Sequence, residues 1–397
     1  MTAIATHLTP RIALACSGLG HIRRGIEAWA QDLSGALTRR DVPVTLFGGA
    51  QGDIPGLVPI KCWKRTSPQA RGTAKLAKHL RGWSYHAGSP YEIEQLTFAL
   101  HLWRRIRDGF DILHVQDPTI AAILNRLHRA GLSRPRVILA NGTGESESKL
   151  GTFPVIQHLT PFSVTGAPHA ARPGQSIFTI SNFIEPTAFE PDRTGADRTA
   201  VRHRLGIAEQ DLVVLCCAAI RRYHKRIDYL IDEFASFLAT VPGRPTTLIV
   251  AGGREQDTDE LIRLATERLG DRVRILVNCP RADMPALYAA ADIFVITSLF
   301  ETFGIVLLEA MASGLPIICH DAPTFRFVAG PAALYGDLSR TGALSEALAT
   351  LSVTEHRAAL AARAMPHVAA KFSEPVVIDQ ILGMYRAVMK DEPHVLN

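Results

Sequence analysis

The chain has 397 residues, 47% of them hydrophobic and 20% charged, a composition that excludes a disordered protein and is typical of a folded globular one. This length suffices for two domains of ordinary size, and no apolar run reaches the length that spans a bilayer. The net charge of +5 is accompanied by no nucleic-acid-binding motif, so nucleic acid is not an expected partner.

The N-terminus and the cysteines both favour a cytoplasmic protein. Residues 1–10 lack the basic start and the apolar core of a secretory signal peptide. The six cysteines form no C-x-x-C pair, and no cluster of cysteines and histidines has zinc spacing. A reducing compartment is therefore expected.

The first half of the chain alternates short apolar segments, typical of buried strands, with segments typical of helices. The expected strands are residues 12–16, 42–47, 111–115, 137–140 and 177–180, and the expected helices are residues 23–38 and 95–107. Repeated βα units predict a parallel sheet with right-handed crossovers. Residues 1–185 are therefore predicted to form a Rossmann-like domain, followed by a polar linker over residues 190–199.

The second half repeats this alternation. The expected strands are residues 212–218, 247–251, 273–277 and 293–296, and the expected helices are residues 227–238, 258–269, 284–289 and 304–313. The pattern predicts a second Rossmann-like domain over residues 186–372. Residues 373–389 are predicted to form an amphipathic helix.

Residues 291–321 carry the most informative pattern: a strand, a loop, a helix that Gly314 ends, and a second strand. Two carboxylates lie in this otherwise apolar segment. Glu301 lies where the first strand ends, and Glu309 lies about two turns into the helix.

This placement predicts a ligand site. In open parallel sheets, ligands bind at the carboxyl ends of strands, where helix N-termini offer free N–H groups. The amides near Thr302, Phe303 and Gly304 would suit a diphosphate. Eight residues of helix span about 12 Å, so Glu301 and Glu309 could reach a sugar ring and a ribose with the phosphates between them.

Glu301, the seven residues after it, Glu309 and residues 310–316 resemble the E-x7-E signature of retaining glycosyltransferases of family 4. That family has a GT-B fold of the α/β class, in which two Rossmann-like parallel-sheet domains face a cleft. The resemblance implies transfer of a hexosyl group, with retained configuration, from a UDP- or GDP-sugar to an acceptor hydroxyl. It implies that Glu301 contacts the donor sugar and Glu309 the ribose, with the backbone of Thr302, Phe303 and Gly304 at the diphosphate.

The resemblance also assigns the domains. Residues 1–185 would be the acceptor-side domain, and residues 186–372 the nucleotide-sugar domain. Residues 373–397 would carry a C-terminal helix that returns to the N-terminal domain. No metal or other cofactor is expected, because cations and helix dipoles carry the charge of the leaving group in such enzymes.

Three cations, Arg221, Arg222 and Lys225, follow the strand predicted at residues 212–218. Arginine can bind a diphosphate bidentately, and lysine acts as a point charge. Lys225 matches the lysine that family members place at this strand-to-helix junction. Ile220 falls near the position of the family's arginine, so either Arg221 or Arg222 is the expected substitute.

Gly18, Gly20 and Gly25 surround the first strand–helix junction. Residues 25–27 line up with the family's Gly-Gly-x-Glu, with Arg24 in place of the first glycine. The resemblance implies that this loop contacts the donor phosphate or the acceptor.

His21 and Glu145, both in predicted loops, are candidates for the acceptor side. Residues 257–259 imitate a D-x-D metal motif, but their place directly before a helix is explained by helix capping. No metal ligand is therefore assigned.

Residues 111–118 resemble the family's D-x-x-H-x-H strand end, with Gln116 in place of the second histidine. Alternation along a strand places His114 and Gln116 on the same face. Gln116 is expected nearest the donor sugar, with His114 deeper. A lone histidine of this kind is more often a hydrogen-bonded core residue than a catalyst.

The positive charge is concentrated in the N-terminal part. Residues 1–110 hold 15 basic against 7 acidic residues, and residues 61–81 hold seven basic residues and no acid, with Trp63 among them. Such a stretch suits anionic lipid headgroups or a phosphorylated acceptor, and equally a solvated basic face. Peripheral contact with the inner face of a membrane is one expectation from it.

Three other functions remain open. A sugar-nucleotide epimerase of GT-B architecture would share the donor residues. A non-catalytic sugar-nucleotide-binding protein would share them too, but would turn over no acceptor. A nicotinamide-dependent oxidoreductase is suggested only by Gly18 and Gly20. The donor base and sugar, the acceptor, whether a saccharide, a lipid-linked group or a small metabolite, and the oligomeric state are not specified.

Overall fold

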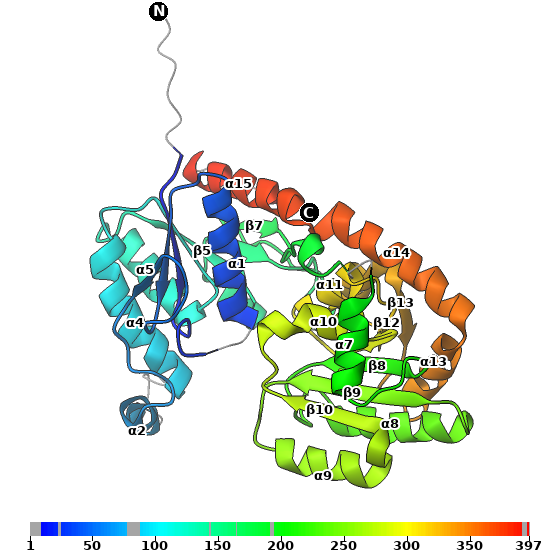
Figure 1. The fold of residues 1–397 in the computed structure, drawn as a ribbon. Helices are drawn as coiled ribbons and strands as arrows, with labels where there is room; N and C mark the ends of the chain where they lie inside the picture. Colours follow the sequence, from blue (N-terminus) through cyan, green and yellow to red (C-terminus); the bar gives the residue numbers. More distant parts are fainter. Residues whose placement is uncertain are drawn as a thin grey trace, which may run out of the picture. The chain divides into compact units, whose positions relative to one another are not determined.

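A computed structural model of the chain describes residues 9–22, 25–77, 88–142, 144–163, 165–190, 194–390 and 395–396. The chain divides into two compact units, each built on one parallel sheet (Figure 1). Unit 1 comprises Met1–Pro161, His169–Ser181 and Ile378–Asn397, and unit 2 comprises Phe162–Pro168 and Asn182–Val377. Across the described residues, no helix has both the length and the apolar character needed to cross a bilayer.

The sheet of unit 1 has eight strands in the order β14-β7-β6-β5-β4-β1-β2-β3. They are β1 (Ile12–Cys16), β2 (Val44–Gly48), β3 (Leu57–Pro59), β4 (Ile112–Val115), β5 (Arg136–Asn141), β6 (Val155–His158), β7 (Ser176–Thr179) and β14 (Val395–Leu396). All neighbours pair in parallel, and Ala15 of β1 lies opposite Val115 of β4. The loops after these two central strands therefore leave the same edge of the sheet side by side.

The helices of unit 1 cover this sheet and connect its strands. They are α1 (Gly25–Arg39), α2 (Pro68–Ala77), α4 (Pro90–Ile106), α5 (Pro118–Arg129) and α6 (Glu147–Leu150). The last helix, α15 (Glu374–Lys390), begins in unit 2 and continues in unit 1. In unit 1, Tyr385 of α15 hydrogen bonds to His114 of β4, and Asp379 pairs with Arg40.

The sheet of unit 2 has six parallel strands in the order β10-β9-β8-β11-β12-β13. They are β8 (Leu212–Cys217), β9 (Thr246–Gly252), β10 (Val273–Val277), β11 (Ile293–Val295), β12 (Ile317–His320) and β13 (Ala333–Gly336). The helices are α7 (Ala196–Arg204), α8 (Ile227–Thr240), α9 (Thr258–Leu269), α10 (Met284–Ala289), α11 (Ile305–Ala312), α12 (Pro323–Ala329), α13 (Ala343–Ser352) and α14 (Thr354–Phe372). Phe294 of β11 pairs with Leu215 of β8, so the loops after β8 and β11 are neighbours.

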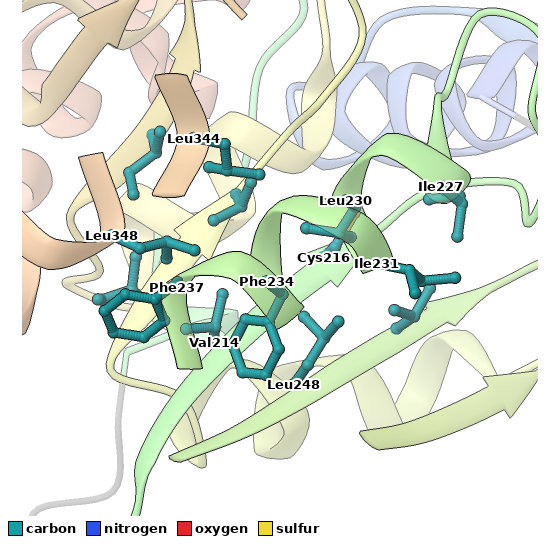
Figure 2. Packing of buried hydrophobic residues seen from close by; sticks show 14 of the residues in the cluster. Val214, Cys216, Ile227, Leu230, Ile231, Phe234, Phe237, Leu248, Leu344 and Leu348 are labelled. Carbon is teal, nitrogen blue, oxygen red and sulfur yellow. The ribbon is translucent and has the colours of Figure 1, made fainter. Parts of the chain in front are cut away.

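The core of unit 2 fixes α8 on this sheet. Phe234 and Phe237 of α8 pack with Val214 of β8, Leu248 of β9 and Leu344 of α13, all of them fully buried (Figure 2). This packing holds the N-terminus of α8 beside the carboxyl end of β8. The intervening loop, residues 218–226, is therefore anchored at both ends.

The prediction of two Rossmann-like parallel-sheet domains is confirmed. The sequence pattern misses β6, because two of its four residues are polar. Gln157 and His158 are nevertheless buried, and Gln157 Nε2 donates to Ile180 O at 2.8 Å. Of the polar linker expected over residues 190–199, residues 191–193 lie outside the described residues, and α7 begins within it at Ala196.

Candidate functional site

An ion pair joins the two neighbouring loops at the carboxyl edge of the unit 2 sheet. Lys225 Nζ, from the loop after β8, lies 2.5 Å from Oε1 of Glu301, from the loop after β11. Both side chains are largely buried, with 17% and 10% of their surface exposed. Thr297 Oγ1 also donates to the backbone carbonyl of Lys225 at 2.7 Å. The structure thus brings together the two residues that sequence patterns 76 positions apart had placed in one site.

The backbone around Lys225 is unusual. His224 and Arg226 both have left-handed conformations, with φ of 70° and 53°. Non-glycine residues rarely adopt this region, and such strain concentrates at functional sites. Lys225 therefore lies between two residues with strained backbone conformations.

Arg221 and Arg222 have different surroundings. Arg221 Nη2 lies 3.2 Å from His224 Nδ1, while Arg221 Nε is buried without a partner among the described residues. Arg222 is 43% exposed, and its guanidinium lies 3.4 Å from Asp228 and 3.9 Å from Glu260. Of the two expected substitutes for the family's arginine, the geometry favours Arg221.

Glu309, on α11, is positioned by a residue that the sequence did not reveal. Tyr288 OH, from α10, donates to Glu309 Oε2 at 2.7 Å, and the tyrosine ring is fully buried. Burial raises the pKa of Tyr288 well above its usual value, so the hydroxyl remains a donor. Glu309 itself is half-buried.

The start of α11 has the features expected for a phosphate-binding turn. Gly304 is the N-cap residue with φ of 84°, a conformation that favours glycine. Phe303 is buried and packs edge-on against Phe372, so its side chain anchors the turn while its backbone is the candidate ligand. Thr302 is half-buried. Ser298, which sequence analysis did not select, is fully buried and its Oγ has no partner among the described residues.

The D-x-D-like segment contacts the loop that carries Lys225. Asp257 is the N-cap residue of α9, and its carboxylate accepts a hydrogen bond from the backbone N–H of Arg222 at 2.7 Å. This amide belongs to the loop after β8 and not to α9, and the Asp257 side chain makes no capping hydrogen bond to α9. The expectation that helix capping explains this residue is therefore wrong. Within the described part of the chain, no cluster of three or more His, Cys, Asp or Glu residues could hold a metal ion.

A second polar cluster lies at the carboxyl edge of the unit 1 sheet, around β1 and β4. Glu94 of α4 is fully buried and accepts hydrogen bonds from Arg65 N, Nε and Nη2, at 2.6, 3.0 and 2.6 Å. Ser17 Oγ donates to it at 3.2 Å, and His21 Nε2 lies 3.0 Å from its Oε2. Burial alone would raise the pKa of Glu94, but the hydrogen bonds from His21 and Arg65 hold it below its usual value.

His21, an acceptor-side candidate, is oriented by this cluster. Its Nδ1 is buried and has no partner among the described residues. Nearby, Asp117 accepts from Tyr91 OH at 2.5 Å and from Ser17 N at 2.7 Å. Burial raises the pKa of Asp117 despite these bonds. Among the described residues around β1 and β4, the buried charged side chains are therefore mainly carboxylates.

The three N-terminal glycines differ in their surroundings. A Cβ on Gly18 would lie 2.0 Å from Glu27 Oε1 and 3.0 Å from Arg65 Nη2. The absence of a side chain at Gly18 therefore leaves the space that the side chains of Glu27 and Arg65 occupy. Gly20 has φ of 94° and packs against the carbonyl of Ala50. A Cβ on Gly25 would meet nothing within 4 Å, so only Gly25 leaves open space for a ligand at the start of α1.

The other two candidates of unit 1 lie in loops. Gln116 is 3% exposed, and its side chain packs against Gly142, where a Cβ would lie 2.2 Å from Gln116 Oε1. Glu145, in the loop after β5, pairs with Lys149 at 2.8 Å.

His114 is a core residue, which corrects its place among the catalytic candidates. It is fully buried, lies 2.9 Å from Tyr385 OH through Nδ1, and packs edge-on against Trp29 and Tyr385. Burial lowers the pKa of His114 to about 3. A neutral, enclosed imidazole has no access to a substrate. Its burial agrees with the expectation that His114 lies deeper than Gln116 and with the greater frequency of such histidines in cores.

Comparisons with known proteins agree with this architecture. Residues 197–362 match the family described as glycosyl transferases group 1. The chain is 26% identical over 305 residues to N-acetyl-alpha-D-glucosaminyl L-malate synthase of Bacillus anthracis, which covers 72% of this chain and 77% of that protein.

Two solved structures share the fold across nearly the whole chain. Sucrose-phosphate synthase from Thermosynechococcus elongatus has a TM-score of 0.75 at 18% identity, covering 96% of this chain and 99% of that one. The Anabaena protein HepE, in complex with UDP-glucose, has a TM-score of 0.68 at 19% identity, covering 95% and 100%. The fold is GT-B, and the protein is a glycosyltransferase.

Replacing Gly304 by alanine tests the turn at the start of α11. An L-residue in the left-handed region loses about 1–2 kcal/mol, so Gly304→Ala should lower the unfolding midpoint of unit 2. Gly383→Ala is the matched control, because Gly383 lies inside α15 and a Cβ there meets nothing within 4 Å. That control should gain about 0.5–1 kcal/mol. Equal midpoints for the two variants in thermal denaturation would contradict the assignment of Gly304.

Proposed function

We propose that the protein is a metal-independent, retaining glycosyltransferase of family 4 that moves a sugar from a nucleoside-diphosphate sugar to an acceptor hydroxyl. The observation that carries this proposal is the Lys225–Glu301 pair, with Arg221 in the same loop and the N-terminus of α11 three residues beyond Glu301. Cations and the backbone amides of a helix N-terminus at one sheet edge suit a diphosphate. The carboxylates at positions 301 and 309 suit the hydroxyls of a sugar and a ribose.

The reaction breaks the bond between the anomeric carbon and the phosphate oxygen. Negative charge then develops on the diphosphate, where Lys225, Arg221 and the amides before α11 would stabilise it. The acceptor oxygen bonds to the anomeric carbon on the same face, and its proton passes to the departing phosphate. We favour this same-face attack over a covalent enzyme intermediate because Glu301, the carboxylate nearest the cations, is already paired with Lys225.

The donor is proposed to be a UDP- or GDP-sugar. A neighbour of the same fold was solved in complex with UDP-glucose, which makes UDP the first base to test. Glu309 would accept hydrogen bonds from the ribose, with Tyr288 holding its other oxygen.

The acceptor is proposed to bind at the unit 1 edge. His21 would offer its free Nδ1 to an acceptor hydroxyl, and Gln116 would contact the transferred sugar. The loop after β1 at this edge contains Gly18 and Gly20, and α1 begins there at Gly25. Glu145 lies in the loop after β5. The relative from Bacillus anthracis carries L-malate in its name, so small hydroxy acids belong in an acceptor screen beside saccharides and lipid-linked sugars.

Product analysis tests the reaction. A thermal-shift screen with UDP, GDP and their sugars should first identify a donor that raises Tm. With that donor and a panel of acceptors, we expect a glycoside of the same anomeric configuration as the donor, formed equally well in EDTA. Epimerised sugar nucleotide formed without acceptor would replace the proposal by an epimerase. An inverted product or loss of activity in EDTA would refute the mechanism.

Variants of Lys225 and Glu309 test the residue roles. Glu309→Ala should weaken binding of UDP or GDP about tenfold, because one hydrogen bond to a charged group is lost. Lys225→Ala should lower turnover more than donor affinity, because its charge is most needed when the diphosphate departs. Arg222→Ala is the control, since its guanidinium pairs with Asp228 and Glu260. Unchanged calorimetric binding in Glu309→Ala would remove the ribose assignment.

We further propose that unit 1 docks on an anionic membrane through a basic surface made by α2 and the segment before it. Lys64, Arg71 and Lys75 are exposed there, and no acidic residue lies between Asp53 and Glu92. Two large apolar side chains accompany them: Trp63 is 47% exposed and Leu76 62%. Basic residues with an adjacent aromatic and an aliphatic side chain are typical of interfacial binding.

Vesicle sedimentation tests this surface. Each basic residue near an anionic bilayer contributes about 1 kcal/mol, so K64E/R71E/K75E should lose binding to phosphatidylglycerol vesicles. W63S/L76S should weaken binding to vesicles but not to heparin, which offers charge without an apolar phase. R263E/R268E/R272E is the charge-matched control on exposed residues of unit 2. Membrane docking would be refuted if all variants bound vesicles equally. It would also be refuted if W63S/L76S bound heparin as weakly as it bound vesicles, relative to the unchanged protein.

A further inference from the structure

His224 lies between Arg221 and the loop that carries Glu301. Its Nε2 is 2.8 Å from the carbonyl oxygen of Phe300, and its Nδ1 is 3.2 Å from Arg221 Nη2. The ring also stacks on Phe300, with the ring centroids 4.6 Å apart. One imidazole therefore connects the arginine of the loop after β8 to the backbone of the loop after β11.

The chemistry of these partners fixes the proton on His224. A carbonyl oxygen only accepts, so Nε2 must carry the hydrogen and donate to Phe300 O. A guanidinium only donates, so Nδ1 must be unprotonated and accept from Arg221. The arrangement works for the neutral imidazole with the proton on Nε2, and for no other form.

The backbone shows that this position of the ring is imposed. His224 adopts φ of 70°, a conformation that disfavours residues with a side chain. Arg221, for its part, has a buried Nε–H without a partner among the described residues. A buried donor left unpaired is unfavourable unless a ligand accepts from it, and an anionic oxygen is the natural acceptor.

We propose that His224 is a positioning residue that holds the Arg221 guanidinium in place for the diphosphate of the donor. The inference rests on the proposed function and adds a group that neither the E-x7-E pattern nor the lysine match includes. His224 does not touch the substrate itself. It acts through Arg221, whose free Nε–H is then presented in one orientation.

The arrangement predicts a dependence on pH. The charged groups that face His224 are Lys225 and Arg221 from its own loop and Glu301 from the neighbouring one. Burial lowers the pKa of His224, with Lys225 and Arg221 acting in the same direction and Glu301 opposing them. Protonation would turn Nδ1 into a donor that faces Arg221, so the contact is present at neutral pH and is lost in acid, below the usual histidine range.

A double-mutant cycle separates this role from a merely structural one. H224G keeps the left-handed backbone and removes the imidazole, and R221Q removes the guanidinium. Each single change should weaken binding of UDP or GDP about tenfold at pH 7.5, as expected for loss of a hydrogen bond to a charged group. In the R221Q background, H224G should change binding by less than about twofold, because the residue through which it acts is gone.

The pH profile provides a second measurement. Affinity of the full-length protein for the nucleotide should fall in acid beyond the titration of the ligand itself, and this excess should vanish in both H224G and R221Q. Y223A is the control for the loop, because Tyr223 is adjacent and 80% exposed. Additive effects in the cycle, or an acid limb that persists in H224G, would overturn the role of His224. If the wild-type protein binds no nucleoside diphosphate, the proposed donor site is refuted, and the role of His224 is refuted with it.

Discussion

The contact between Lys225 and Glu301 is possible only because β8 and β11 are adjacent parallel strands. In a parallel pair, the loops that follow both strands leave the same edge of the sheet. Residues far apart in the chain therefore lie close together through the strand pairing alone. A largely buried ion pair adds little net stability, since desolvation offsets most of its Coulomb energy. The strained residues on either side of Lys225 subtract further. The geometry of this edge is therefore maintained at some expense of stability.

The two sheets present edges of opposite electrostatic character. In unit 2 the carboxylate of Glu301 is outnumbered by Lys225 and Arg221. In unit 1, among the described residues around β1 and β4, two buried carboxylates, Glu94 and Asp117, accompany the guanidinium of Arg65. An edge with surplus cations suits a nucleotide diphosphate. Glu94 and Asp117, by contrast, are enclosed and already hydrogen bonded to His21, Arg65, Tyr91 and Ser17, so they position neighbouring side chains.

The sequence predicted what depends on neighbouring residues and missed what depends on packing. The Rossmann-like repeats, the helix over residues 305–312 and the roles of Gly304 and Gly314 follow from local patterns of apolar residues and glycine. Tyr288 could not be found this way, because only the packing of α10 against α11 brings its hydroxyl to Glu309. The contacts of Glu94 with Arg65 and His21 likewise join segments 29 and 73 residues apart. His114 is the opposite case, a residue included among the catalytic candidates that lies in the core. Both faces of its strand are covered, so alternation along the strand could not distinguish a core residue from a site residue.

The loop that carries Lys225 is fixed before any ligand arrives. At one end, the backbone N–H of Arg222 donates to Asp257 at 2.7 Å. At the other end, Arg226 donates to the carbonyl of Leu338 at 2.6 Å and stacks over Tyr229 at 4.0 Å. These contacts of the Arg226 side chain compensate for its strained left-handed backbone. A glycine would adopt that backbone conformation without strain, but it has no side chain to make the contacts with Leu338 and Tyr229. A cation held in this way needs little reorganisation when charge develops on a leaving group, and preorganisation of that kind is what makes electrostatic stabilisation effective in catalysis.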